Sequence, residues 1–151
     1  MEREPNMQTT SIWVLLNVAH KQVVQAFERE LKRNGLPPVY WYEVLRNLEL
    51  NPQGLRQNEL QTMSLYTQVN LSRNVKGMVE QGFVKQTKAE NDGRGRVLTL
   101  TEKGAEMRVR MWEIYSGLMV SEIEDRVPKD IAPAFIKGLR SLVPDVTWTP
   151  E

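Results

Sequence analysis

The chain has 151 residues, of which 40% are hydrophobic and 26% charged, so its composition predicts a folded domain rather than a disordered chain. It contains no cysteine and one histidine, which excludes disulfides, thiol chemistry and zinc clusters. The formal net charge is +1, so any affinity for nucleic acid has to come from the placement of charge. No cofactor and no metal are expected.

The first residues, Glu2-Arg3-Glu4-Pro5, lack the apolar core of a signal peptide. No apolar run approaches the roughly 20 residues that span a bilayer. We therefore expect a cytoplasmic chain without a membrane partner.

Three helices are predicted in the first part of the chain. After a flexible arm of residues 1–9, apolar residues at steps of three and four predict a helix over 10–34. Asn34-Gly35 and the prolines that follow end it. The same periodicity predicts a second helix over 39–50 and a third, shorter one over 54–63.

A fourth helix is predicted to begin at Thr67, whose side chain can accept a hydrogen bond from a free backbone N–H. Its apolar residues Leu71, Val75 and Met78 share one face, and it ends at Gln81-Gly82. This helix leads directly into the most informative stretch of the chain.

Residues 82–104 read as strand, turn, strand and helix start. Loose alternation through Phe83 and Thr87 predicts the first strand, and residues 97–100 predict the second. Between them, Asp92, Gly93 and Gly95 supply turn chemistry. Arg94 and Arg96 lie at the tip, where cations can reach an anion. Residues 67–104 contain seven basic and four acidic residues. A hairpin with basic residues at its tip, directly after a helix, is typical of a DNA-binding wing.

Two helices are predicted to follow the hairpin. One runs from Gly104 to about Arg126, Pro128 breaks it, and the last spans 129–142 before an irregular tail of residues 144–151. The segments 10–34 and 105–143 are rich in apolar residues and need a partner surface. A second copy of the chain is the economical partner, although a monomeric helical bundle would also use these faces. Residues 35–104 form the remaining lobe, all within one compact domain.

The wing region resembles the MarR family of winged helix–turn–helix transcriptional regulators. The family pattern is Asp-x-Arg followed by Leu-Thr-x-x-Gly, and this chain matches it at all five positions. These positions are Asp92, Arg94, Leu100, Thr101 and Gly104. The segments 71–75 and 81–84 resemble the family's recognition helix and its exit into the wing, with Asn74 where Leu is common.

The resemblance implies a mainly α fold with a small β-hairpin wing, in which a winged helix–turn–helix is flanked by long dimerisation helices. It implies a homodimer that binds double-stranded DNA at a pseudo-palindromic operator. Most members repress transcription, and many release DNA when a small aromatic or anionic effector binds. The resemblance does not supply the operator sequence.

The fourth helix would then enter the major groove, which carries a full donor and acceptor code. The face opposite the core holds Val69, Arg73 and Lys76, with Gln68 and Asn70 near the helix start. Arg73 is expected to fork to guanine, Gln68 or Asn70 to pair with adenine, and Lys76 to meet phosphate. Arg73 and Lys76 could instead form a solvated helix face, and Asn70 could cap locally instead of reading a base.

In the wing, Arg94 or Arg96 is expected in the minor groove, because narrow A·T tracts attract cations. Family structures imply that Asp92 orients Arg94 and stabilises the wing. Arg94 could be mainly structural with Arg96 as the groove contact, and the sequence does not separate the two. Thr101 and Glu102 are expected to cap the next helix.

An effector pocket is a further hypothesis. Aromatic rings with a few polar groups make suitable walls for an aromatic ligand. The candidate residues are Trp13, Asn17, His20, Trp41, Tyr42, Trp112 and Tyr115. Aromatic residues at helical spacing are more often core or dimer interface, and His20 is better explained as a partly exposed helix residue.

Two other functions were weighed against a DNA-binding regulator. A winged helix can serve as a protein-interaction module without ligand control, and DNA affinity that weakens steeply with salt distinguishes the two. An enzyme is not expected, because the sequence has no phosphate-cradling glycine loop, no metal-ligand cluster and no triad around His20.

Overall fold

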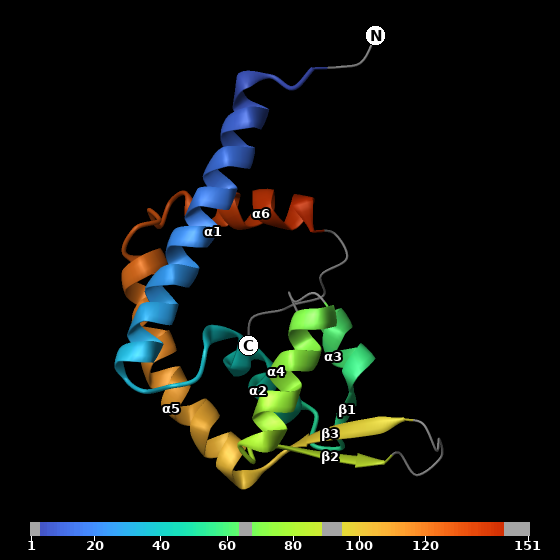
Figure 1. The fold of residues 1–151 in the computed structure, drawn as a ribbon. Coiled ribbons are helices and arrows are strands. Elements are labelled where there is room, and N and C mark those ends of the chain that lie inside the picture. Colours follow the sequence, from blue (N-terminus) through green and yellow to red (C-terminus); the bar gives the residue numbers. More distant parts are fainter. Residues whose placement is uncertain (1–3, 64–67, 89–94, 144–151) are drawn as a thin grey trace. The chain divides into compact units, whose positions relative to one another are not determined.

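The computed structural model describes residues 4–63, 68–88 and 95–143 (Figure 1). The chain divides into two compact units, Met1–Tyr115 and Ser116–Glu151. Apolar side chains of the second unit are mostly exposed. Among the helices of the described ranges, none combines the length and the hydropathy of a membrane span.

The first unit begins with α1 (Met7–Arg33), which starts three residues before the predicted helix. The reason is a cap: Asn6 Oδ1 accepts a hydrogen bond from the Thr9 backbone N–H at 2.8 Å, so residues 7–9 of the predicted arm are helical. Residues up to Gln22 are exposed, whereas Ala26, Phe27 and Leu31 are buried. Only the second half of α1 therefore belongs to the core.

The end of α1 places α2 (Val39–Leu50). Gly35 has a positive φ of 65°, and Leu36 N donates to Leu31 O at 2.9 Å, as in a Schellman motif. The Glu28 carboxylate of α1 then accepts from Val39 N at 3.0 Å, which satisfies the first free N–H of α2. The bounds predicted for the second helix are confirmed.

A short strand that the sequence did not predict precedes α3. Residues Leu55–Arg56 form β1 and pair antiparallel with Leu98 and Val97 of β3, so α3 spans Gln57–Met63 and not 54–63. Two residues are too few to show the period of a strand. A Cβ at Gly54 would lie 2.5 Å from Val97 Cγ1, so only glycine allows β1 to approach β3 this closely.

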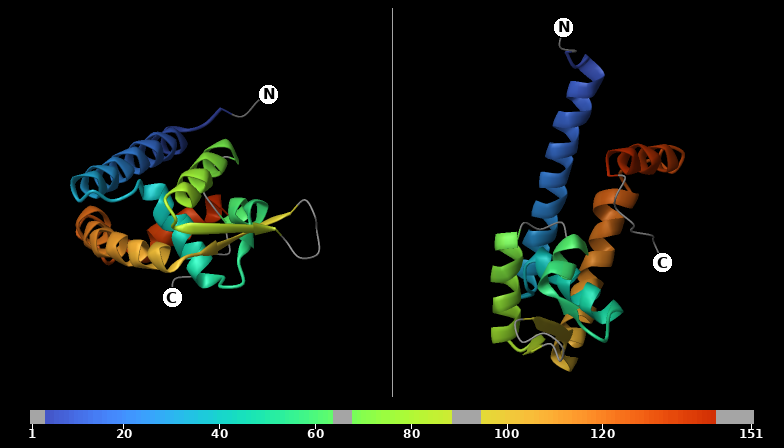
Figure 2. Two further views of the ribbon diagram at one scale, coloured as in Figure 1. Left: turned by 60° about the horizontal axis from the view of Figure 1, so that its bottom comes forward. Right: turned by 90° about the vertical axis from the view of Figure 1, so that its right-hand side faces the viewer.

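The sheet has the order β1-β3-β2, with β2 (Val84–Lys88) and β3 (Arg96–Leu100) forming the hairpin. Helices α2, α3 and α4 (Gln68–Glu80) pack on it, and in Figure 2 they stand on one side of the strands. Leu55, Val84 and Leu98 are buried on that side. The prediction of a mainly helical fold with a small β wing is confirmed, with β1 as a third strand.

The junction of α4, the wing and α5 (Glu102–Met119) is tightly packed. Gly82 has a φ of 78°, and Phe83 N donates to Met78 O at 2.9 Å, which ends α4 and starts the hairpin. Thr101 Oγ lies 2.7 Å from Gly82 O and accepts from Gly104 N at 3.0 Å. Thr101 therefore caps α5, as expected.

The second unit differs from the predicted helices in two ways. After α5 the chain continues as a π-helical turn, Val120–Glu124, in which Asp125 N donates to Val120 O at 2.9 Å. The last helix, α6, spans Ala132–Leu142 and not 129–142, because Ile131 N and Ala132 N both bond to Pro128 O in a turn.

Candidate nucleic-acid interface

Helix α4 separates an apolar face from a basic one. Leu71, Val75 and Met78 are buried, with at most 3% of their surface exposed, and they fix the helix on the core. Arg73 and Lys76 are exposed on the opposite side, as the periodicity predicted. Asn70 is exposed as well, and Gln68 and Val69 lie in the first turn of the helix.

Trp41 of α2 packs against α4 and fixes its position. Its indole Nε1 donates to Asn74 Oδ1 of α4 at 3.3 Å, and its ring meets Phe83 edge to face at 6.0 Å between centroids. A Cβ at Gly77 would lie 3.0 Å from Trp41 Cζ2, so glycine lets the helix sit closely on the ring. Asn74, which stands where the family often has Leu, thus has a structural role as the acceptor for Trp41.

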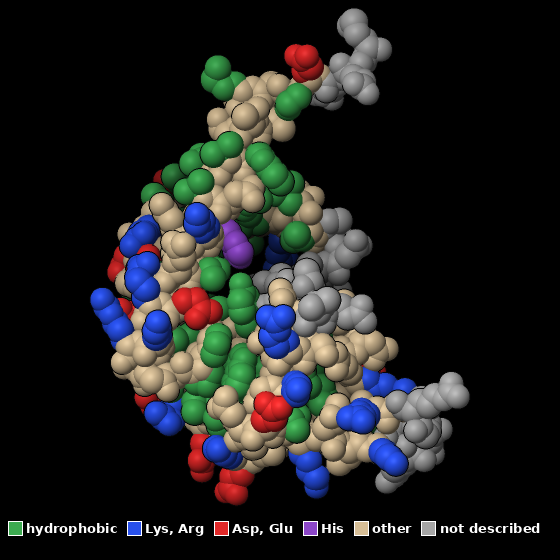
Figure 3. All heavy atoms as spheres, in the orientation of Figure 1, with side chains coloured by type: hydrophobic (Ala, Val, Ile, Leu, Met, Phe, Trp, Pro, Cys, Tyr) green, Lys and Arg blue, Asp and Glu red, His purple; other side chains and the backbone are tan. Residues whose placement is uncertain are grey.

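The hairpin carries cations on both of its faces. Lys85 and Lys88 of β2 and Arg96 of β3 are exposed, and Lys88 pairs with Arg96 in the register. Arg96 Nη1 donates to Gln86 Oε1 at 3.1 Å across the strands. Lys and Arg side chains gather over α4 and the described part of the hairpin (Figure 3). The predicted wing residues Asp92 and Arg94 lie outside the described residues.

A groove of about 500 Å³ lies where α4 faces the hairpin. Lys76 and Arg96 both line it, so it brings together two of the predicted DNA contacts. The other polar groups of its wall were not among the predicted DNA contacts; they are Gln57, Ser72, Glu80 and Gln86. The spacing Ser72, Lys76, Glu80 along one helix face was the available signal for two of them.

Three of the seven predicted pocket residues form a stack. Tyr42 of α2 lies against Tyr115 of α5, 4.3 Å between ring centroids, and against Trp112 at 6.0 Å. Trp41 is not part of this stack, because it packs toward α4. Trp13, Asn17 and His20 are exposed in the first half of α1, and Asn17 donates to Trp13 O at 2.7 Å.

The tyrosines of the stack stay protonated well above neutral pH. Burial raises the pKa of Tyr115 above its ordinary value, and the neighbouring Tyr42 adds to this shift. Its hydroxyl donates to Val39 O at 3.2 Å, which ties α5 to the start of α2. Burial also raises the pKa of Tyr42, although the cations Arg46 and Arg108 offset part of the effect.

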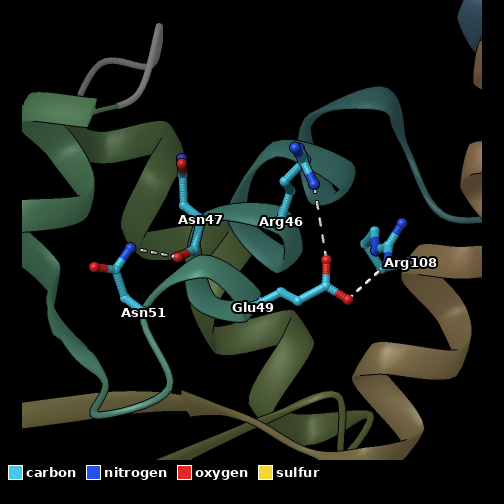
Figure 4. A network of polar contacts seen from close by, with 5 residues as sticks. All are labelled: Arg46, Asn47, Glu49, Asn51 and Arg108. Carbon is cyan, nitrogen blue, oxygen red and sulfur yellow. Dashed lines mark hydrogen bonds and ion pairs between the residues drawn. The ribbon is translucent and has the colours of Figure 1, made fainter. Parts of the chain in front are cut away.

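Beside the stack, an ion pair joins α2 to α5 (Figure 4). Arg108 Nη2 lies 2.7 Å from Glu49 Oε1, and the two side chains are 18% and 30% exposed. Arg46 lies on the other side of the Glu49 carboxylate, with Nη1 3.9 Å from Oε2. Asn51 Nδ2 donates to Asn47 O at 2.8 Å and closes the end of α2. The ion pair between Arg108 and Glu49 therefore holds α5, the helix that follows the wing, on the core of the lobe.

Comparison with known sequences gives a family match over part of the chain. Residues 34–95, which run from the end of α1 to the hairpin, match the sequence model of the MarR family. Over this segment, which is less than half of the chain, the sequence is similar to the MarR family. A comparison with the curated proteins finds no match.

Solved structures extend the likeness in fold to nearly the whole chain. A MarR family regulator of Streptomyces coelicolor in complex with DNA has a TM-score of 0.84 at 20% identity, covering 97% of this chain and 96% of its own. AbsC from the same organism has a TM-score of 0.81 at 21% identity, covering 94% and 96%. The organohalide-sensing regulator RdhR, bound to 2,4-dichlorophenol, has a TM-score of 0.78 at 19% identity, covering 94% and 86%.

The stability of the lobe should depend on the ion pair between α2 and α5. We expect Glu49→Ala to lower the free energy of unfolding by about 1–3 kcal/mol, because it leaves the largely buried Arg108 guanidinium without its carboxylate. The Nε of Arg108 is already buried without a hydrogen-bond partner among the described residues, so little compensation is at hand. Urea denaturation measures the change.

The matched control is Glu30→Ala, which removes an ion pair of similar geometry at the surface. Glu30 lies 2.6 Å from Arg33, whose side chain is 72% exposed. Exposed pairs contribute little, so this variant should stay within about 0.5 kcal/mol of the parent. Equal effects of the two substitutions would show that burial does not strengthen the pair between α2 and α5.

Proposed function

We propose that the chain is a sequence-specific DNA-binding transcriptional regulator that binds a pseudo-palindromic operator as a homodimer. The observation that carries this proposal is the exposed basic face of α4, next to a hairpin that bears further cations. A structural neighbour of the same family was solved in complex with DNA, which supports it. Such a regulator works where the chromosome lies, so the cytoplasmic location is part of the proposal.

In this proposal α4 enters the major groove. Arg73 is exposed, and within the described ranges it makes no ion pair, so its guanidinium is available for a guanine edge. Gln68 and Asn70 stand near the start of α4, where base contacts are usual, and Val69 accompanies them. The wing supplies the minor-groove contact, from Arg94 or Arg96, with Asp92 as the residue that orients Arg94.

Exposed apolar side chains support the homodimer. The first half of α1 exposes Ile12, Trp13 and Leu15 by 59%, 68% and 65%, and hydrophobic side chains are visible along it in Figure 3. Helix α6 also exposes Phe135 and Ile136 at about half of their surface. A row of large apolar residues of this extent marks an interaction surface. A second copy of the chain, related by a two-fold axis, would cover both helices.

Repression and release by a small aromatic or anionic effector complete the proposal. The neighbour RdhR is a sensor solved with 2,4-dichlorophenol, an aromatic compound. In this chain the rings of Tyr42 and Tyr115 stack directly on each other, so no ligand fits between these two rings. An aromatic ligand would therefore have to stack on the exposed side chain of Trp112. The other proposed pocket residues lie outside this stack, in the first half of α1; they are Trp13, Asn17 and His20.

Selection of bound sequences from random duplex DNA tests the proposal. We expect a two-fold symmetric motif with half-sites about 10 base pairs apart, because two recognition helices of a dimer lie about one helical turn apart. On the best site, Arg73→Ala should cost about 1–3 kcal/mol of binding free energy and relax the preference at one position of each half-site.

Arg33→Ala is the matched control, because it removes an exposed cation at the end of α1 and should leave the selected motif unchanged. Recovery of random, unrelated sequences with the parent protein would contradict sequence-specific binding. If Arg73→Ala binds the best site as tightly as the parent, Arg73 does not read a base.

A further inference from the structure

Two cations line the groove between α4 and the hairpin, and the proposed function gives them separate roles in DNA binding. Its volume is about 500 Å³, and Lys76 of α4 and Arg96 of β3 stand in its wall. The polar side chains between them are Gln57, Ser72, Glu80 and Gln86. The groove therefore connects the recognition helix to the wing, and its wall also includes the apolar side chains of Val75 and Val79.

Arg96 is held in place by a neutral partner. Gln86 is only partly exposed and pairs with Leu98 in the register, so it lies diagonal to Arg96 on the face of the hairpin that packs toward α4. Its Oε1 accepts from Arg96 Nη1 at 3.1 Å. An amide fixes the direction of the guanidinium without neutralising it, and among the described acids none forms an ion pair with Arg96. The full positive charge of Arg96 is thus presented to the groove.

Lys76 has a weaker and charged partner. Its Nζ lies 3.8 Å from Glu80 Oε1, and the two side chains are 78% and 64% exposed. Exposed ion pairs at this spacing contribute little free energy, so an anion that enters the groove can take Lys76 from Glu80 at small cost. Glu80 remains as the negative group of the wall and repels such an anion.

Resting on the proposed function, we propose that this groove seats a phosphate of the DNA backbone, which Lys76 and Arg96 bind together. A helix in the major groove and a wing in the next minor groove are separated by one strand of the duplex, so the surface between them faces phosphates. Gln86 positions Arg96, and Glu80 competes with the phosphate for Lys76. Arg96 is then a backbone contact, and the minor-groove role falls to Arg94.

The test is the affinity of the full chain for its selected duplex across a salt series. Each phosphate contact contributes about one unit to the slope of log K against log salt concentration. Lys76→Gln and Arg96→Gln should each lower the slope by about one and weaken all duplex sequences alike. Gln86→Glu should lower it similarly, because a carboxylate in place of the amide neutralises Arg96.

Glu80→Gln should act in the opposite direction. Without the competing carboxylate, affinity should rise about two- to fivefold at low salt, in line with the strength of an exposed ion pair. In the double variant Lys76→Gln/Glu80→Gln most of this gain should disappear, because Glu80 acts mainly through Lys76. Arg33→Gln is the control: it removes one exposed cation at the end of α1, outside α4 and the hairpin, so the slope should not change.

Three results would overturn the phosphate seat. One is a loss for Arg96→Gln that is confined to A·T-flanked sites, which would indicate minor-groove reading. Another is a slope for Arg33→Gln that falls as far as that for Arg96→Gln. The last is parent-like binding by Lys76→Gln and Arg96→Gln while the parent itself binds with a steep slope. Absence of binding by the parent would instead refute the proposed function, and the phosphate seat with it.

Discussion

Gly104→Ala is expected to lower the free energy of unfolding by about 3 kcal/mol or more. A Cβ at this position would lie 2.1 Å from Phe83 O and 2.8 Å from Leu100 Cδ1. The Phe83 carbonyl cannot move away freely, because it also accepts the Thr101 N–H at 3.1 Å. The strain therefore falls on the backbone at the point where α4, the wing and α5 meet. Urea denaturation of the purified variant measures the loss.

Gly117→Ala is the control for this substitution, because it adds the same methyl group to the same helix. No atom lies within 4 Å of a Cβ built at Gly117. Alanine favours helix over glycine, so this variant should gain up to about 1 kcal/mol. A Gly104→Ala protein as stable as the parent would mean that the junction adapts, and that glycine is not required there.

The second large effect is expected at the exposed face of α1. The double variant Ile12→Glu/Leu15→Glu should dissociate the proposed dimer, because an interface on this face would have to bury two unpaired carboxylates. Loss of the second subunit removes the linkage between two half-sites, which should weaken operator binding by about a hundredfold or more. Analytical ultracentrifugation and a binding titration measure the two consequences.

Because Ile12 and Leu15 are exposed in the single chain, the double variant should keep its helical circular dichroism. Gln22→Glu, which adds a charge at an exposed polar position of the same helix, should remain a dimer. A dimer that survives the double substitution would place the interface elsewhere, and a parent protein that is monomeric would refute the homodimer itself.

Local signals predicted most of the fold. The bounds of α2 are set by Pro38 before it and Asn51-Pro52 after it, and both signals are visible in the sequence. β1 could not be predicted, because its two residues become a strand only by pairing with Val97 and Leu98, some forty positions later. The π-helical turn after Met119 likewise gives no periodic signal that separates it from an α-helix.

The candidate site, like the fold, could be predicted from the sequence only in part. Helical period alone placed Arg73 and Lys76 opposite the buried Leu71 and Met78. The contact between Gln86 and Arg96 depends on the register of two strands, which the turn residues did not fix. For the aromatic residues, composition could not tell Trp41, which seats α4, from Tyr42 and Trp112, which stack beside α5.

The central claim is that the chain binds duplex DNA through cations on α4 and the wing. The most direct measurement is the affinity of the unmodified protein for its selected duplex as the salt concentration rises from about 50 to 200 mM. We expect the affinity to fall at least several hundredfold, as several phosphate contacts release their counterions. Affinity that does not change with salt, or no binding to any duplex at low ionic strength, would contradict the claim and favour a winged helix used for protein interaction.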